Sequence, residues 1–410
     1  MSTIERPALA DLADPAVLPD PYPVLAGLRA ASPFAEMDGA FVVVGRYADC
    51  SAVLRDPRAS SQREESLIAR GGSSAVRRRD RPSFLSLDPP DHTRLRRLVS
   101  TAFTARTVAR LEPRIRAVTG ELLGAAVAAG QLEVVSQLAY PLPVRIISEM
   151  LGVPVEDHPR FAGWSARLAS SLQPGFGLDP AEALARAEAA QVAGDEFADY
   201  FRELIARRRA QPTEDLLSEM ISAEDAGQKL TEDELIATCI LLLVAGHETT
   251  VGLISNAILA LLRHPGQLAL LQEDPSLAPG AVEETLRYDA PVQMTARVAR
   301  DGMQIGNVAA RDGALVLLLL AATGRDPDAF ADPDTFDIRR SAANHLAFAA
   351  GPHFCLGAPL ARLEAAIALQ EFAATLAKPE LDPDALRYKP NLNLRGPDQL
   401  VVQFAGIRPR

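Results

Sequence analysis

Cysteine is scarce in this chain of 410 residues, in which only Cys50, Cys239 and Cys355 occur. Three widely spaced cysteines form neither a disulfide framework nor a zinc knuckle, and a reducing compartment is the simplest inference. Long apolar runs are also missing, because the longest, such as "LVLLLLAA" from Leu315, fall well short of the roughly 18 residues of a membrane span. The amino terminus lacks a basic segment followed by an apolar run, so no signal peptide is visible. We therefore expect a soluble, cytoplasmic protein.

Positive charge is in short supply as well. Lysine and arginine number 42 against 53 aspartates and glutamates, and the formal net charge is −11. This balance argues against partners that attract by charge alone, namely nucleic acid and acidic membrane lipid. What the chain does have is apolar residues, 48% of the total, which is ample for a sizeable core. No repeat and no low-complexity linker divides it, so we expect a single domain over residues 1–410.

Helical patterns dominate between short strand-like pieces. The predicted helices cover 94–103, 108–129, 144–151, 180–209, 231–263, 281–288 and 358–377. The segments "PFAEM" and "FVVV" predict a hairpin around Asp38 and Gly39. Further strands are predicted within 294–298, 303–305 and 314–320. The fold class is therefore mainly α with a small β part (α+β), and the β part comes from both ends of the chain. Two polar, Gly/Pro-containing stretches, in 60–88 and 170–180, are candidates for binding loops or lids, with simple disorder as the alternative.

The helix predicted from Thr231 is apolar on all sides, which is typical of a helix that runs through a core. Thr231 and Glu234 form a capping box, and His264 with the following proline ends the helix. The segment "AGHETT" interrupts this helix with Glu248 and two threonines, which are costly to bury without partners. Either the threonines bond back to carbonyls one turn earlier and Gly246 allows a tight helix crossing, or a small ligand sits against a kinked helix here.

Two charged pairs stand at helical spacing. His92 and Arg96 share one face at a helix start, where they could clamp an anion or simply form a solvated basic face. Glu284 and Arg287 would usually be a surface ion pair worth under about 1 kcal/mol, unless they are buried.

The stretch "FAAGPHFCLG" places Cys355 in a loop of small residues directly before a helical segment. Helix N–H groups near the sulfur favour the thiolate. From these residues alone, Cys355 could be a reactive nucleophile, a metal ligand or an inert thiol.

In this order, His92…Arg96, "AGHETT", Glu284…Arg287 and the Cys355 loop resemble cytochrome P450, the haem-thiolate monooxygenases, of the soluble bacterial type. The resemblance covers nearly the whole chain. It implies the cytochrome P450 fold, with haem b between the long central helix and the Cys355 loop. Cys355 thiolate would be the axial ligand, Gly351 and Gly357 would let the loop lie close under the porphyrin, and Phe348 would shield the sulfur.

The resemblance also implies roles for the other motifs. Four side chains would hold the haem propionates: His92, Arg96, Arg297 and His353. Glu284, Arg287 and Arg340 would form a buried structural network. Thr249 and Glu248 would be the catalytic pair that delivers protons during oxygen activation. Where the family often has glycine after the phenylalanine of the loop, this chain has Ala349, and where it often has asparagine before Arg325 it has Gly324.

Function follows from the resemblance as an expectation. One oxygen atom of O2 would enter an apolar small molecule, by hydroxylation or epoxidation, as in secondary metabolism. The pocket would be lined by the loops at 60–88 and 170–180 and by six side chains: Leu241, Val244, Ala245, Val292, Thr295 and Leu394. Electrons would come from a ferredoxin and its reductase, with Arg94, Arg97 and Arg362 as candidate docking residues on a monomer.

Two alternatives stay open. One is a haem-thiolate protein that binds or senses a ligand without oxygenating it, and it would not need Thr249. The other is a helical protein without haem, in which Cys355 is a buried thiol or joins His345 and His353 in a zinc site, although three ligands on one loop suit zinc poorly.

Overall fold

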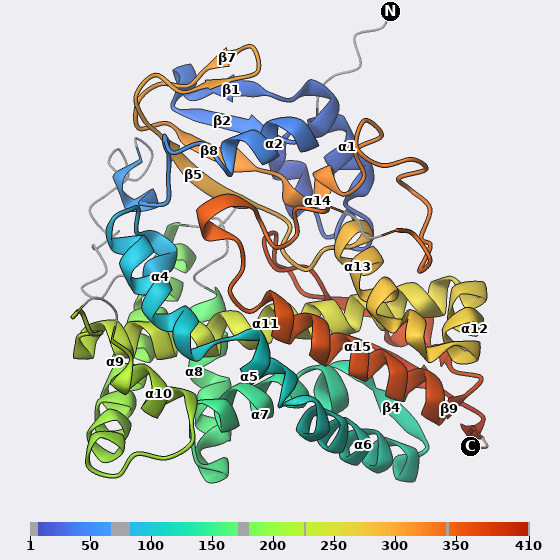
Figure 1. Ribbon diagram of the computed structural model, residues 1–410. Helices are drawn as coiled ribbons and strands as arrows, with labels where there is room; N and C mark the ends of the chain where they lie inside the picture. The colour runs from blue at the N-terminus through green and yellow to red at the C-terminus, as the bar shows by residue number, and fades with distance from the viewer. Residues whose placement is uncertain (1–6, 67–82, 171–179, 225–226, 342–343, 409–410) are drawn as a thin grey trace, which may run out of the picture.

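The computed structural model describes residues 7–66, 83–170, 180–224, 227–341 and 344–408. Helices make up most of this part of the chain, and a twisted sheet lies on one side of a long central helix (Figure 1). The predicted fold class, mainly α with a small β part, is confirmed. The proposed binding loops fall largely outside the described residues, at 67–82 and 171–179.

The largest sheet joins the two ends of the chain. Its strand order is β1-β2-β8-β5-β3. The bounds are β1 Phe34–Glu36, β2 Phe41–Val44, β3 Ala59–Ser60, β5 Thr295–Ala299 and β8 Leu315–Leu318. The predicted hairpin is β1–β2, and both Asp38 (φ 53°) and Gly39 (φ 79°) adopt the left-handed conformation that its tight turn needs. Strand β2 then pairs in parallel with β8, so a β region drawn from distant segments is confirmed.

Smaller sheets complete the β part. One has the order β10-β13-β4, and three are two-stranded. Their strands are β4 Gln131–Glu133, β6 Gln304–Ile305, β7 Val308–Ala309, β9 Leu376–Ala377, β10 Glu380–Leu381, β11 Arg387–Tyr388, β12 Pro397–Gln399, β13 Val401–Gln403 and β14 Gly406–Ile407.

The α-helices enclose the core. They are α1 Tyr22–Ala31, α2 Tyr47–Val53, α4 Asp91–Ala102, α5 Ala105–Ala109, α6 Glu112–Ala129, α7 Pro141–Met150, α8 His158–Ser170, α9 Pro180–Ala210, α10 Leu216–Ser222, α11 Glu232–Arg263, α12 Pro265–Glu273, α13 Ala278–Tyr288, α14 Leu320–Thr323 and α15 Ala358–Thr375. The predicted helix over 108–129 was too long, because Pro113 lacks a backbone N–H and sits in the first turn of α6, which leaves α5 as a separate helix.

Helix α11 crosses the whole molecule in Figure 1, with α15 packed beside it. The predicted capping box is present: the Glu234 N–H donates to the Thr231 hydroxyl at 3.3 Å, and the Thr231 N–H donates to the Glu234 carboxylate at 2.8 Å. The helix runs unbroken through "AGHETT". By length and composition, α11 could cross a membrane, although its uninterrupted apolar runs are short. However, 61% of its most apolar window is buried inside the molecule, as in the core helix of a globular protein.

A buried polar network ties the amino-terminal segment to the loop between β11 and β12. Arg395 donates to the Asp289 carboxylate at 2.6 Å and to the backbone carbonyl of Pro19 at 3.1 Å. The Tyr22 hydroxyl donates to the same carboxylate at 2.9 Å. Because Asp289 caps the end of α13, this network fixes the β11–β12 loop against the helical core.

Candidate active site

Cys355 lies where the loop turns into α15. Its backbone N–H donates to the Phe348 carbonyl at 3.0 Å, which closes the loop. Burial raises the pKa of the Cys355 thiol, and the backbone N–H groups of Gly357 and Ala358 oppose that rise by bonding to the sulfur. Cys50 and Cys239 are fully buried, whereas Cys355 is only partly covered. Of the three cysteines, Cys355 alone combines access with N–H donors aimed at sulfur.

The loop owes its shape to two residues with left-handed backbone. Gly351 has φ of 69°, and an added Cβ would lie 2.4 Å from the Leu54 carbonyl oxygen. Glycine is therefore required there by packing against the residue 54–55 backbone, a reason that the sequence did not reveal. Ala349 has φ of 58°, a conformation that costs a non-glycine residue roughly 1–2 kcal/mol. Next to Gly357, by contrast, only the Cys355 sulfur would contact a new Cβ, at 4.0 Å.

The four predicted anion-binding side chains converge on one place. The His92 and His353 rings lie 4.0 Å apart between centroids, and Arg96 donates to the Phe354 carbonyl beside Cys355. Both nitrogens of the buried His92 ring lack a hydrogen-bond partner among the described residues. Arg297 is buried on β5, and its guanidinium donates to the Ala296 carbonyl of its own strand at 2.9 Å.

Positive charge is concentrated here, and Asp88 offsets it only in part. Burial and then the neighbouring Arg63 lower the pKa of Arg297 to about 10. Burial, with His92 and the nearby arginines, lowers the pKa of His353 to about 3. A cluster of buried donors and cations with depressed pKa values fits a dianionic group such as a pair of carboxylates.

Sequence reasoning missed Ser61 and Arg63 at this cluster. The Ser61 hydroxyl lies 2.9 Å from Nε2 of His353, 292 positions away in sequence. Asp88 holds the segment in place, because its carboxylate accepts from the Ser61 N–H at 2.8 Å and from the Ser60 hydroxyl at 2.5 Å. In the sequence, the only signal for Ser61 and Arg63 was that both lie within the suspected binding loop 60–88.

Glu284, Arg287 and Arg340 form one buried network. Arg287 is fully buried and donates to both Glu284 oxygens at 2.8 Å, and Arg340 Nε lies 3.1 and 3.2 Å from the same oxygens. Arg287 also donates to the Gly324 carbonyl at 2.7 Å. A Cβ at Gly324 would lie 2.0 Å from the Arg287 carbonyl oxygen, so the missing asparagine side chain has a steric reason that the sequence did not show.

On α11 the polar break has two distinct sets of partners. The Thr249 hydroxyl donates to the Ala245 carbonyl at 2.8 Å, and Thr250 donates to Gly246 at 2.9 Å, as the purely structural alternative expected. A hydroxyl that has given its hydrogen still has lone pairs with which to accept one from a ligand. Gly246 would meet only the Ile147 side chain at ordinary contact distance if a Cβ were added, so no tight helix crossing requires it.

Glu248 is held as a carboxylate. Lys389 donates to it at 3.1 Å, and His247 Nε2 lies 3.6 Å away. Burial by itself would raise the pKa of Glu248, but His247 and Lys389 outweigh it and lower the pKa to about 2. His247 Nδ1 must carry a hydrogen, because it lies 2.7 Å from the Leu243 carbonyl, which can only accept.

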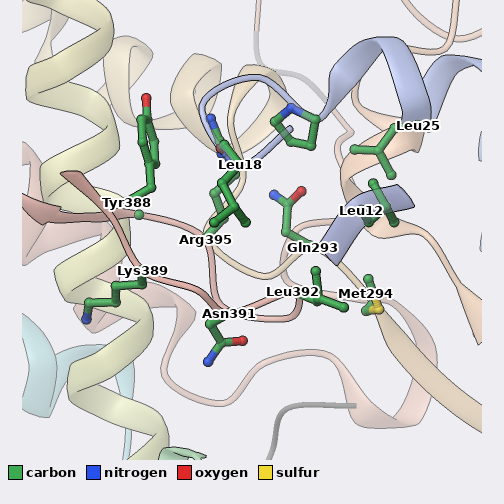
Figure 2. Close-up of a pocket in the computed structure, with 12 residues that line it drawn as sticks. Leu12, Leu18, Leu25, Gln293, Met294, Tyr388, Lys389, Asn391, Leu392 and Arg395 are labelled. Atoms are coloured by element: carbon green, nitrogen blue, oxygen red, sulfur yellow. The ribbon is translucent and has the colours of Figure 1, made fainter. Parts of the chain in front are cut away.

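Lys389 also borders a cavity of about 30 Å³, a volume that holds one or two water molecules (Figure 2). Gln293, Asn391 and Arg395 line the same cavity, and Lys389 extends from its rim on the side of α11. Lys389 thus links this small, largely apolar cavity to the ion pair of Glu248.

The predicted pocket residues come from three places. Leu241, Val244 and Ala245 are on α11, where Ala245 is exposed although it lies in the middle of the helix. Val292 and Leu394 pair in an isolated β-bridge, and Thr295 begins β5. The structure thus brings Val292 and Leu394 together across 102 positions of sequence, while the lining expected from 67–82 and 171–179 lies outside the described residues.

The candidate docking arginines lie on two helices, α4 and α15. Arg94 forms an ion pair with Glu234, and Arg362 makes two hydrogen bonds to Glu283 at 2.6 and 3.0 Å. Arg97 is exposed on α4.

A zinc site at His345, His353 and Cys355 is not formed. Within the described ranges, no group of three or more His, Cys, Asp or Glu side chains is arranged to hold a metal ion. His345 instead bonds to Glu283 at 3.2 Å, and His353 faces Ser61.

Haem fits the residues that are present. The Cys355 sulfur receives backbone N–H groups, and within the described chain both nitrogens of the buried His92 ring lack hydrogen-bond partners. Burial and neighbouring cations lower the pKa values of Arg297 and His353. These are the features needed for a thiolate–iron bond and for two propionates.

Comparison with known proteins gives the same family. The family model for cytochrome P450 matches residues 37–378. Cytochrome P450 107B1 of Saccharopolyspora erythraea is 43% identical over 373 residues, 88% of each chain. Cytochrome P450 monooxygenase PikC of Streptomyces venezuelae is 42% identical, covering 94% of this chain and 91% of PikC. The crystal structure of ligand-free CYP164A2 from Mycobacterium smegmatis superposes with a TM-score of 0.88 at 47% identity, covering 96% of this chain and 99% of that one.

The cofactor of this family is haem bound through a cysteine thiolate, and the relatives are named as monooxygenases. The chain therefore belongs to the cytochrome P450 family and is a haem-thiolate monooxygenase.

Proposed function

We propose that this protein inserts one oxygen atom of O2 into an apolar small molecule, by hydroxylation or epoxidation, with Cys355 as the axial ligand. The observation that carries the proposal is the loop geometry: a partly covered sulfur that receives two backbone N–H groups at the start of α15. His92, Arg96, Arg297 and His353 would hold the propionates, and Ser61 joins them through its 2.9 Å contact with His353.

When bound, the haem supplies the oxygen chemistry, and the thiolate supplies electron density to it. The residues of α11 would handle protons. Thr249, whose own hydrogen is given to Ala245, has hydroxyl lone pairs that would accept a hydrogen from a protonated group or water on this side of α11. Glu248, ionised and paired with Lys389, would pass protons inward from the surface.

The substrate class follows from the pocket candidates. Leu241, Val244, Ala245, Val292 and Leu394 carry no polar side-chain atoms, and Thr295 adds one hydroxyl. Such a lining favours a largely hydrophobic molecule that is oriented by shape and by very few hydrogen bonds.

Electrons would reach the haem from a separate ferredoxin and its reductase in the cytoplasm. The chain has three cysteines in all, too few for an iron–sulfur cluster with four cysteine ligands. Arg97, which is exposed on α4, is one docking candidate. Charge reversal at Arg97 should slow reduction by an acidic ferredoxin, and more strongly at low ionic strength.

The ligand assignment is tested by the absorption of the reduced protein under carbon monoxide. Wild type should show the red-shifted Soret band of thiolate ligation, and Cys355→Ser should lose it. Cys239→Ser, at a fully buried cysteine, is the matched control and should keep the band. A globin-like band in wild type would contradict the assignment.

Oxygenation is separated from mere ligand binding by Thr249→Ala. The variant should still bind substrate but should convert a large part of its electron supply into hydrogen peroxide. Thr250→Ala, which removes a hydroxyl bonded in the same way one residue on, is the control and should stay coupled. Equal coupling in wild type and Thr249→Ala would favour a haem-thiolate sensor.

A further inference from the structure

A second acidic residue stands directly before the buried network of Glu284 and has its own partners. Glu283 on α13 accepts two hydrogen bonds from the Arg362 guanidinium on α15, at 2.6 and 3.0 Å. His345 Nε2 approaches the same carboxylate at 3.2 Å, and its Nδ1 accepts the Ala347 N–H at 3.3 Å. The nitrogen that faces Glu283 must therefore carry the hydrogen, and all three contacts of the carboxylate are donated by the protein.

The cluster of Glu283, Arg362 and His345 packs against the loop that carries Cys355. The Arg362 guanidinium lies over the Phe348 ring, 4.6 Å from its centroid, and the His345 ring is 5.9 Å from the same ring. The Phe348 carbonyl in turn accepts the backbone N–H of Cys355 at 3.0 Å. One aromatic ring thus separates the ion pair from the residue that binds the iron.

Arg362 is close enough for its charge to act on the sulfur. Together with Arg96, it opposes the effect of burial on the Cys355 thiol. Glu283 remains ionised near neutral pH: burial would raise its pKa, but His345 and Arg362 outweigh this and lower the pKa to about 2. The carboxylate therefore opposes the field that Arg362 exerts on the thiolate.

We propose that the Glu283–Arg362 pair sets the reduction potential of the haem by balancing charge beside the Cys355 thiolate. Glu283 is a positioning residue in this scheme: it fixes and neutralises Arg362, which acts on the sulfur. The inference rests on the proposed function, because it requires Cys355 to be the iron ligand.

The sign follows from the charge on the haem. One-electron reduction of the ferric centre adds a negative charge, so any added positive charge nearby favours the reduced form. Glu283→Gln leaves Arg362 without its counter-charge and should shift the potential in the positive direction. Arg362→Gln removes the cation but keeps the carboxylate and should shift it in the negative direction. The double variant should return toward the wild-type value.

The measurement is a dye-mediated potentiometric titration of the purified, haem-loaded protein, with dithionite as reductant, so that no ferredoxin docking enters. The control is Glu149→Gln, because Glu149 and Arg114 form a pair of the same two-bond geometry, at 2.6 and 2.8 Å, between α6 and α7. We expect opposite shifts for the two single variants, both larger than that of the control.

Each outcome decides the inference. Shifts of the same sign, or shifts no larger than that of Glu149→Gln, overturn it. Conversion of Glu283→Gln to a form without the thiolate Soret band also overturns it, since the pair would then act as a mechanical clamp. If wild type itself lacks that band, the proposed function fails and the inference with it, a result that the carbon monoxide spectrum separates from all the others.

Discussion

Replacing Glu284 by glutamine should destabilise this protein far more than the loss of an ordinary ion pair. The side chain keeps its shape but loses its charge, while Arg287, which is fully buried, and Arg340 keep theirs. The Glu284 carboxylate accepts from both arginines and from the Asp337 N–H at 2.9 Å. No water can replace it, because its side chain is only 1% exposed.

The magnitude follows from that burial. Removing one partner of a buried pair costs about 3–5 kcal/mol, because the remaining charge is left uncompensated. Exposed pairs are worth about 0.2–1 kcal/mol. At a urea dependence of about 3 kcal/mol per molar, the unfolding midpoint should fall by on the order of 1 M.

Urea unfolding, followed by both circular dichroism and the Soret band, measures this midpoint. The control is again Glu149→Gln, whose pair with Arg114 is 30% and 48% exposed, and it should move the midpoint by only a small fraction of that shift. If Glu284→Gln and Glu149→Gln lower the midpoint equally, burial does not determine the worth of this network and the reasoning is wrong.

Three further predictions concern the backbone and the proton path. Ala349→Gly should stabilise the Cys355 loop by about 1 kcal/mol, since φ at this position is 58°, and a higher temperature of haem loss would show it. Gly324→Ala should destabilise by about 1–3 kcal/mol in urea unfolding, because its Cβ would overlap the Arg287 carbonyl. Lys389→Met should raise the pKa of Glu248 from about 2 toward its ordinary 4.5. A depressed carboxyl pKa contributes stability that is fully present above the ordinary pKa and is lost as the pH falls through the lowered pKa. The variant should therefore lose less stability than wild type between pH 4.5 and 2. An identical acid dependence of the two proteins would contradict the role of Lys389.

Much of the site was predictable because its signals are local. The capping box of Thr231 and Glu234, the apolar surface of α11 and the loop "FAAGPHFCLG" are each contained in a few tens of residues. Helix ends and N–H groups near a cysteine depend on backbone geometry that neighbouring residues set. The order of four such motifs was enough to indicate the family.

Contacts between distant segments were not predictable in the same way. Lys389 meets Glu248 across 141 positions, and Ser61 meets His353 across 292. The steric need for glycine at positions 351 and 324 also arises from other segments, the residue 54–55 backbone and the Arg287 carbonyl. No periodicity in the sequence encodes the packing angles that produce these approaches.

The sequence by itself therefore determined the class of chemistry, because short motifs are sufficient to indicate a cysteine loop and a central helix that bears hydroxyl groups. Tertiary structure alone decided which charges are compensated: Glu284 by Arg287 and Arg340, Glu248 by Lys389, and Glu283 by Arg362. The physical reason is that the energy of a charge depends on its burial and on partners within a few ångströms, and both are fixed only when helices and loops distant in the chain have packed together.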